Sequence, residues 1–136
     1  MSQTDTIKPV PTPNPETRAF WEACNNEQLT VQGCEDCGHK QHYPRLLCTS
    51  CRSSNLTQVP VSGRGTITSF TINRVPVSSA FAETLPYAVG LIHLEEGPCF
   101  MANIIDCDPE TLHIGQSVVV LFETRGNQKL PQFCPL

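Results

Sequence analysis

Apolar side chains near the start of the chain recur at the spacing of an α-helix. The first of them is Phe20, and Asn14 and Pro15 precede it with the chemistry that favours a helix start. We therefore predict a helix over residues 15–26. Phe20 and its neighbour Trp21 project about 100° apart on a helix, so one ring can face the protein while the other reaches a neighbouring molecule.

Residues 29–61 follow a different pattern. Two short strand-like runs, at residues 29–31 and 56–59, flank two pairs of cysteines, and few other apolar residues are present. A segment of this size cannot bury a hydrophobic core of its own. The pattern is typical of a ribbon module that something other than apolar burial must stabilise.

The remaining residues, 62–136, are strand-like almost throughout. β-branched and aromatic residues predict five strands, over residues 66–75, 87–94, 99–105, 117–123 and 130–134. Gly97 suits the turn of a hairpin between the second and third strands, and Asp108 with Pro109 predicts a short helical turn before the fourth. Five short strands suit a small barrel, and the OB-fold is the leading candidate.

Composition and charge narrow the class of protein. The longest unbroken apolar run, residues 118–122, is far shorter than the roughly 20 residues of a membrane span. Residues 1–15 are polar and proline-rich and lack the apolar stretch of a signal peptide, so we expect a cytoplasmic protein with no membrane partner. The 9 Lys and Arg against 13 Asp and Glu argue against bulk binding of nucleic acid.

The strongest chemical signal is the spacing of four of the eight cysteines. Cys34 and Cys37 form one CxxC pair, and Cys48 and Cys51 form a second. Each pair can turn tightly and aim two thiolates at one point, so together they predict a tetrahedral site for one structural zinc ion. Four protein ligands leave no open position, and such a site holds the fold together without catalysing a reaction.

Other interpretations of the cysteines stay open at this stage. A rubredoxin-like iron site also uses four thiolates, and Gly38 fits it, but Arg52 stands where the second pair would need a glycine. A CxxC redox enzyme would need a thioredoxin-like alternation of strands and helices, which is absent. His39 and His42 are expected to be surface or hydrogen-bonding residues.

The four cysteines outside the zinc site are expected to be buried packing thiols: Cys24, Cys99, Cys107 and Cys134. Asp106 and Asp108 flank Cys107, and their negative charges oppose formation of a thiolate there. The sequence contains no nucleophile elbow, phosphate-binding loop or HExxH motif. We therefore expect a chain that is not an enzyme on its own.

The order of several short motifs resembles a known family over nearly the whole chain. The motifs are Phe20-Trp21, the two cysteine pairs with Tyr43-Pro44-Arg45 between them, Ser62-Gly63-Arg64-Gly65, Leu85-Pro86-Tyr87, Leu94-Glu95-Glu96-Gly97-Pro98, Ile114-Gly115, and Leu130-Pro131-Gln132-Phe133-Cys134-Pro135. In this order they resemble the zinc-ribbon/OB-fold proteins once catalogued as domain of unknown function 35. Arg52 departs from the glycine that is usual in that family.

The resemblance implies a mainly β fold with an N-terminal helix, a rubredoxin-like zinc ribbon and then a five-stranded OB-fold barrel. The expected segments are residues 1–13 as a flexible arm, 14–28 as the N-terminal helix, 29–61 as the zinc ribbon and 62–136 as the barrel with its C-terminal tail.

The resemblance also implies a function. Members of this family are small accessory subunits of thiolase-superfamily enzymes such as thiolases, acyltransferases and steroid side-chain aldolases. By this analogy Arg45, Arg64 and Arg74 are candidates for the CoA phosphates, and Phe81 for the acyl group. Phe20 and Trp21 are candidates for the partner interface.

Two alternative functions use the same fold elements. OB barrels and zinc ribbons also occur in proteins that bind single-stranded nucleic acid, which requires aromatic platforms and a basic groove. A rubredoxin-like iron electron carrier is the other alternative. The low aromatic content of 7% and the net charge of −4 count against nucleic acid as a partner.

Overall fold

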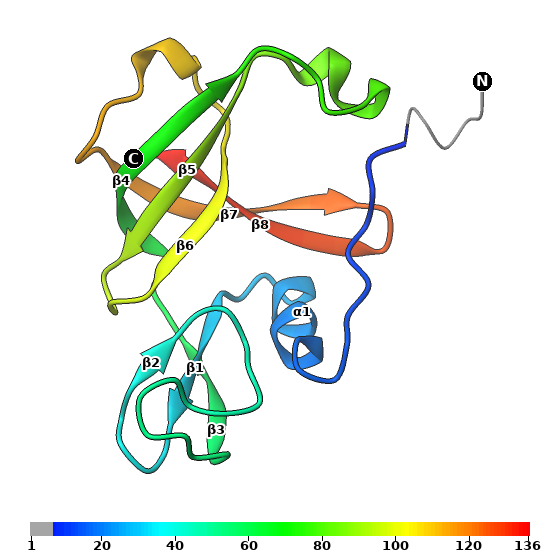
Figure 1. Ribbon diagram of the computed structural model, residues 1–136. Coiled ribbons are helices and arrows are strands. Elements are labelled where there is room, and N and C mark those ends of the chain that lie inside the picture. The colour runs from blue at the N-terminus through cyan, green and yellow to red at the C-terminus, as the bar shows by residue number, and fades with distance from the viewer. Residues whose placement is uncertain (1–6) are drawn as a thin grey trace.

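Strand β1 (Thr30–Cys34) is the centre of a three-stranded antiparallel sheet in the computed structural model, which describes residues 7–136. It lies between β2 (Lys40–Gln41) and β3 (Leu56–Pro60), and all five of its residues are buried. Val31 pairs with Val59 across the sheet. This sheet forms the predicted ribbon, seen at the bottom of Figure 1.

The second half of the chain closes into a five-stranded barrel. Its strands are β4 (Arg64–Asn73), β5 (Tyr87–Leu94), β6 (Cys99–Ile104), β7 (Ser117–Arg125) and β8 (Gln128–Pro135). Their order around the barrel is β4-β5-β6-β8-β7. A closed five-stranded barrel confirms the predicted mainly β fold and its OB-type architecture.

The barrel encloses most of the hydrophobic core. β5 alternates between buried and more exposed residues, so that Ala88, Ile92 and Leu94 point inward with no exposed area. Phe133 of β8 is also fully buried. This alternation is what a strand with one buried face requires, and the observed bounds of β5 are the predicted ones.

Helix α1 (Arg18–Asn25) packs against the C-terminal strand β8. Asn25 accepts a hydrogen bond through Oδ1 from the backbone N–H of Lys129 (2.8 Å), and the side chain of Gln128 donates to the carbonyl of Trp21 (3.1 Å). In Figure 1 the helix lies between the ribbon and the β7–β8 hairpin. Contacts between residues more than 100 positions apart thus hold the helix in place.

Several boundaries differ from the predictions by one to three residues, and two elements were not predicted. The helix begins at Arg18, three residues later than predicted, and the turn before it has the predicted capping bond, in which Thr17 N–H donates to Asn14 Oδ1 (2.9 Å). A 3-10 helix (η2, Ser79–Thr84) and the two-residue strand β2 were not predicted. The predicted turn after Asp108 is confirmed as a 3-10 helix (η3, Pro109–Thr111), capped by the Asp108 side chain.

The proline-rich start of the chain lies against the barrel where the structure describes it. The carbonyl of Pro9 accepts a hydrogen bond from Arg125 (3.2 Å), and the Lys8 ammonium lies 5.7 Å from the centre of the Phe81 ring. The predicted flexible arm covers residues 1–13, and residues 1–6 of it lie outside the described residues.

Candidate functional site

The four predicted cysteine ligands converge in the ribbon. Their Sγ atoms all lie within 4.8 Å of one another, and two of the pairs, Cys34 with Cys51 and Cys37 with Cys48, are 3.6 Å apart. A zinc ion with Zn–S bonds of about 2.3 Å needs tetrahedral ligands about 3.8 Å apart. The four thiols therefore fit a closed, four-thiolate zinc site.

The two turns that carry these cysteines share one backbone geometry. Gly38 N–H donates to the carbonyl of Cys34, and Arg52 N–H donates to the carbonyl of Cys48, each at 2.9 Å. Gly38 has φ +76° and Arg52 has φ +67°. Arg52 thus adopts the left-handed conformation that glycine usually supplies. Its side chain makes this conformation less favourable in free energy, but the turn still forms.

Backbone N–H groups favour the thiolate form of Cys48, whereas the pKa values of Cys37 and Cys51 are raised in the same cluster. The N–H of Cys51, together with that of Ser50, lowers the pKa of Cys48 to about 6. Ser50 N–H lies 3.4 Å from Cys48 Sγ. Since zinc binds thiolates, donors aimed at the sulfur prepare the site for the metal.

Two buried glutamines hold the loop between the cysteine pairs. Gln32 accepts the backbone N–H of Arg45 (2.8 Å) and donates to the carbonyl of the same residue (2.9 Å). Gln41 donates to Gln32 Oε1 (2.8 Å) and accepts the N–H of Thr49 (2.9 Å). These bonds fix a loop whose large apolar side chains, Leu46 among them, remain exposed.

Aromatic rings join the ribbon, the helix and the barrel. His42 stacks on Phe100 with ring centres 4.1 Å apart, and its ring centre lies 5.4 Å from that of Phe20 and 4.2 Å from that of Tyr43. Burial lowers the pKa of His42 to about 4, so the ring is neutral at pH 7. Its Nδ1 is buried without a hydrogen-bond partner among the described residues, and the side chain as a whole is half-buried, so His42 is less exposed than expected. His39 is exposed, with Nε2 3.0 Å from Thr49 Oγ1, as expected.

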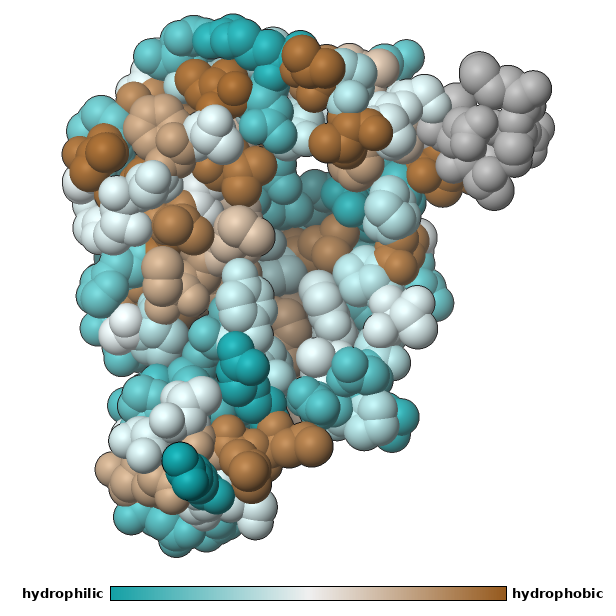
Figure 2. Space-filling view, in the orientation of Figure 1, coloured by the Kyte–Doolittle hydropathy of each residue, from teal (hydrophilic) through white to brown (hydrophobic). Residues whose placement is uncertain are grey.

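A groove of about 290 Å³ lies beside this aromatic cluster. Three parts of the chain line it: α1, the loop after β2, and the facing strands β6 and β8. Its lining residues are Thr17, Phe20, Trp21, His42, Tyr43, Pro44, Phe100, Met101, Ala102, Asn103, Leu130, Pro131 and Gln132. None of them is Asp, Glu, Lys or Arg. Figure 2 shows this face of the molecule hollowed between the barrel and the helix.

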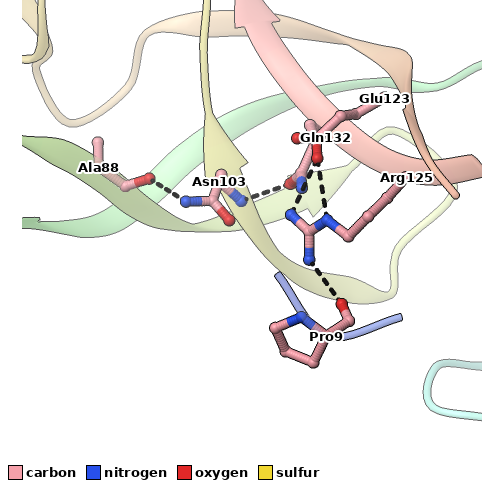
Figure 3. Close-up of polar contacts among 6 residues, drawn as sticks. All are labelled: Pro9, Ala88, Asn103, Glu123, Arg125 and Gln132. Atoms are coloured by element: carbon pink, nitrogen blue, oxygen red, sulfur yellow. Dashed lines mark hydrogen bonds and ion pairs between the residues drawn. The ribbon is translucent and has the colours of Figure 1, made fainter. Parts of the chain in front are cut away.

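The groove lies where the pairing between β6 and β8, which closes the barrel, is incomplete. β6 and β8 run parallel and pair at one position, Ile104 with Phe133. One step further along, the N–H of Asn103 donates to the side-chain Oε1 of Gln132 (2.8 Å), as Figure 3 shows, while Asn103 Nδ2 donates to the carbonyl of Ala88 (3.4 Å). A side chain thus takes the place of the next backbone pairing.

The structure does not bring the four CoA candidates together. Arg64 begins β4 and Arg74 follows its end, and a ten-residue strand is about 33 Å long. Arg74 forms an ion pair with Glu110, and Phe81 lines a cavity of about 220 Å³ that Lys8 also lines. Arg45 lies apart from these residues, beside a different cavity of about 620 Å³.

The two aromatic residues of α1 have different environments. Phe20 is 4% exposed and belongs to the core, so its ring is not free to contact a partner. Phe20 is therefore the ring that faces the protein, where it contacts His42 and Phe100, and the part of α1 in a partner interface stays a prediction. Trp21 is partly exposed and lines the groove. Sequence reasoning missed Tyr43 and Met101 on the same surface, which are 48% and 55% exposed.

The remaining cysteines do not form a reactive centre. Burial raises the pKa of Cys24 to about 12. Burial and the charge of Asp108 raise the pKa of Cys107, in the direction predicted from its acidic neighbours. Cys99 is exposed, so its expected burial is wrong. Within residues 7–136, the four zinc-site cysteines are the one cluster of His, Cys, Asp or Glu that could hold a metal ion.

A four-thiolate ribbon followed by a closed five-stranded barrel defines a zinc-ribbon/OB-fold protein. Two family models match the chain: "ChsH2, rubredoxin-like zinc ribbon domain" over residues 21–57 and "ChsH2, C-terminal OB-fold domain" over residues 58–123. The chain belongs to the DUF35 family of ChsH2-type proteins.

The chain matches different shares of the length of its named relatives. A "DUF35 domain-containing scaffold protein" of Methanothermobacter thermautotrophicus is 35% identical over 95 residues, which are 69% of this chain and 71% of the relative. A "Probable enoyl-CoA hydratase alpha subunit" of Thermomonospora curvata is 30% identical over 130 residues, which are 95% of this chain but 40% of that longer protein.

A solved structure matches most of the chain. One chain of the "Ltp2-ChsH2(DUF35) aldolase" superposes with a TM-score of 0.85 and 29% identity, over 93% of this chain and 98% of the other. The ribbon and barrel thus have the same mutual arrangement in both. Across residues 7–136, no helix combines the length and apolar character needed to cross a bilayer.

Proposed function

We propose that this chain is a non-catalytic subunit of a thiolase-type enzyme complex and that it handles acyl-CoA together with its partner. The observation that carries the proposal is the likeness to a chain of the Ltp2-ChsH2(DUF35) aldolase over 98% of that chain. Relatives named as DUF35 scaffold proteins support the same assignment.

The chemistry of the site supports a non-catalytic role. The zinc site has four thiolate ligands and no open position, so it cannot activate water or a carbonyl group. The raised pKa values of Cys24, Cys107 and Cys134 disfavour a thiolate nucleophile at these positions. The catalytic residues of the assembled enzyme would then belong to the partner.

The groove beside α1 is the best candidate for the partner interface. Trp21 lies on one wall, and the exposed side chains of Tyr43 and Met101 extend the apolar surface onto the ribbon and the barrel. Aromatic residues and methionine are enriched in protein interfaces. Phe20 supports this surface from below through its contact with Trp21, with ring centres 5.0 Å apart.

Two regions are candidates for contact with acyl-CoA. Arg45 shares its cavity with Lys40 and His39, and also with Glu96; its guanidinium and the Lys40 ammonium are donors suited to phosphate groups. Phe81 and Lys8 line the second cavity, where an acyl group could contact the ring. Arg64 and Arg74 lie outside both cavities and are weaker candidates.

Co-expression tests the proposal. The chain should co-purify with the thiolase-fold protein encoded beside its own gene, and acyl-CoA turnover should require both proteins. The chain alone should show no turnover. If no stable complex forms with such a protein, or if the thiolase-fold protein is equally active alone, the proposal is wrong.

A second experiment addresses acyl-CoA. In the complex, Arg45→Ala should raise the KM for acyl-CoA, whereas the matched control Arg52→Ala, an exposed arginine of the same ribbon outside both cavities, should not. Equal KM values for the two variants would remove Arg45 from the proposal.

The cysteines bear on the compartment of the complex. Because all eight cysteines are free and four fit a zinc site, we propose that the complex works in the reducing cytoplasm.

A further inference from the structure

We propose that the open edge of strand β6 binds an extended segment of the partner protein as an additional β-strand. The inference rests on the proposed function and names the way in which the partner docks. It follows from three features: the direction of the backbone groups of β6, the failure of β8 to pair with them, and the uncharged groove in front of them.

The pairing pattern shows which backbone groups of β6 face outward. The N–H of Leu94 donates to the carbonyl of Pro98 across the β5–β6 hairpin, and hydrogen-bonded pairs alternate along an antiparallel ladder. The backbone N–H and C=O groups of Phe100 and Ala102 therefore point toward β5. The same groups of Cys99 and Met101 point away from β5, to the side on which the N–H of Asn103 bonds to Gln132.

Strand β8 cannot supply hydrogen-bond partners for the outward-pointing backbone groups of β6 at Cys99 and Met101. Pro131 has no N–H to donate, and the N–H of Lys129 is already bonded to Asn25. Pairing between β6 and β8 stops at Ile104. Among the described residues, the backbone N–H and C=O groups of Cys99 and Met101 on this edge therefore have no protein partner.

The groove defines the chemistry of the occupant. Its lining contains no Asp, Glu, Lys or Arg, and His42 is neutral because burial lowers its pKa to about 4. An uncharged groove does not favour a phosphate or a charged side chain. It suits an extended peptide that offers backbone N–H and C=O groups to Met101 and an apolar side chain to Trp21 and Tyr43.

A proline substitution can remove the donor on this edge. Met101→Pro deletes the N–H that faces the groove, and it breaks no ladder bond to β5 because that N–H points away from β5. Met101→Val is the matched control, since it also shortens the side chain but keeps the N–H and a strong strand propensity. Both variants should retain one zinc ion per chain.

The experiment measures affinity for a thiolase-fold protein that co-purifies with the wild-type chain. Met101→Pro should weaken the complex about tenfold, as expected for the loss of one hydrogen bond. Met101→Val should weaken it about threefold or less, and Trp21→Ala should weaken it substantially. In the wild-type complex, hydrogen exchange at the amides of Cys99 and Met101 should slow relative to the free chain.

Three results would overturn the inference. Equal affinity of the proline and valine variants, with a complex still formed, would refute strand addition but leave the proposed function standing. Absence of any complex with the wild-type chain would refute both. Slowed amide exchange at Met101 in the free chain on addition of pantetheine, or on formation of a homodimer, would assign the edge to a different occupant.

Discussion

The imidazole ring of His42 lies almost flat on the ring of Phe100, with an interplanar angle of 16° and ring centres 4.1 Å apart. His42 belongs to the ribbon and Phe100 to barrel strand β6. Phe20 of α1 completes the cluster, with its ring centre 6.1 Å from that of Phe100. One stack of rings therefore fixes the ribbon, the helix and the barrel relative to one another.

The unfolding free energy should depend on pH because His42 is partly buried in this stack of rings. Burial lowers the pKa of His42 from 6.5 to about 4, so the unfolded chain binds a proton that the folded chain does not bind between these pH values. Its contribution to stability is fully present above pH 6.5 and is lost as the pH falls toward 4, by about 2 kcal/mol at pH 5. Chemical denaturation at pH 7.5, 6 and 5 measures the effect.

His42→Phe is the control for that measurement. It keeps an aromatic ring in the stack and removes the titrating group, so the difference in unfolding free energy between wild type and variant should change with pH by about 2 kcal/mol between pH 7.5 and 5. Protonation of zinc-bound thiols affects both proteins alike. A difference that does not vary with pH would show that the folded His42 titrates normally.

Removal of the metal should unfold the ribbon. The protein is expected to hold one zinc ion per chain and to be colourless, in contrast to a rubredoxin-type iron protein. Chelation, or Cys48→Ser, should lower the unfolding free energy by several kcal/mol, since zinc binding in small modules is worth about 10 kcal/mol or more. Metal analysis and circular dichroism before and after chelation test this expectation.

Arg52→Gly should stabilise the protein. Arg52 adopts φ +67°, a conformation that glycine takes without steric cost, so the substitution should raise the unfolding free energy by about 1 kcal/mol. Arg52→Ala removes the same charge but keeps a Cβ atom, and it should leave stability close to that of wild type. Gly38→Ala should destabilise the matching turn, because Gly38 has φ +76°. Thermal melts of the zinc-loaded proteins distinguish these cases.

Thiol labelling should identify Cys99 as the one readily modified cysteine of the zinc-loaded protein. Cys99 is exposed, whereas burial raises the pKa of Cys24 to about 12 and, with nearby charges, raises the pKa of Cys107 and Cys134. Iodoacetamide at pH 7.5 should therefore modify one site rapidly. Cys99→Ala should abolish the rapid phase, which mass spectrometry can follow, and rapid labelling of Cys107 would contradict the expectation.

Local sequence patterns predicted the elements that depend on neighbouring residues. The run of strand-forming residues from Tyr87 to Leu94 located β5 with its observed bounds, and the CxxC spacing identified the metal site, because each pattern reflects contacts within a few residues. The start of α1 was predicted three residues early, although Asn14 makes the capping bond to Thr17 that its chemistry favours. No local signal distinguishes the Asn14–Thr17 turn from the first turn of a helix.

The groove could not be predicted in the same way. Its walls come from segments more than 100 residues apart, such as Trp21 and Pro131, and their approach depends on how the barrel closes. The half-buried, stacked position of His42 also depends on Phe100, which lies in another part of the fold. A site formed by residues far apart in the sequence produces no periodic pattern from which it could be predicted.

The attachment of α1 to β8 has a consequence for synthesis on the ribosome. The ribbon is complete once β3 has emerged and can bind zinc while the barrel is still being translated. The helix, although it is made first, cannot reach its hydrogen-bonding partners Gln128 and Lys129 until the last strand appears. We expect the nascent chain to acquire its metal early and to complete the walls of its groove only at the end of translation.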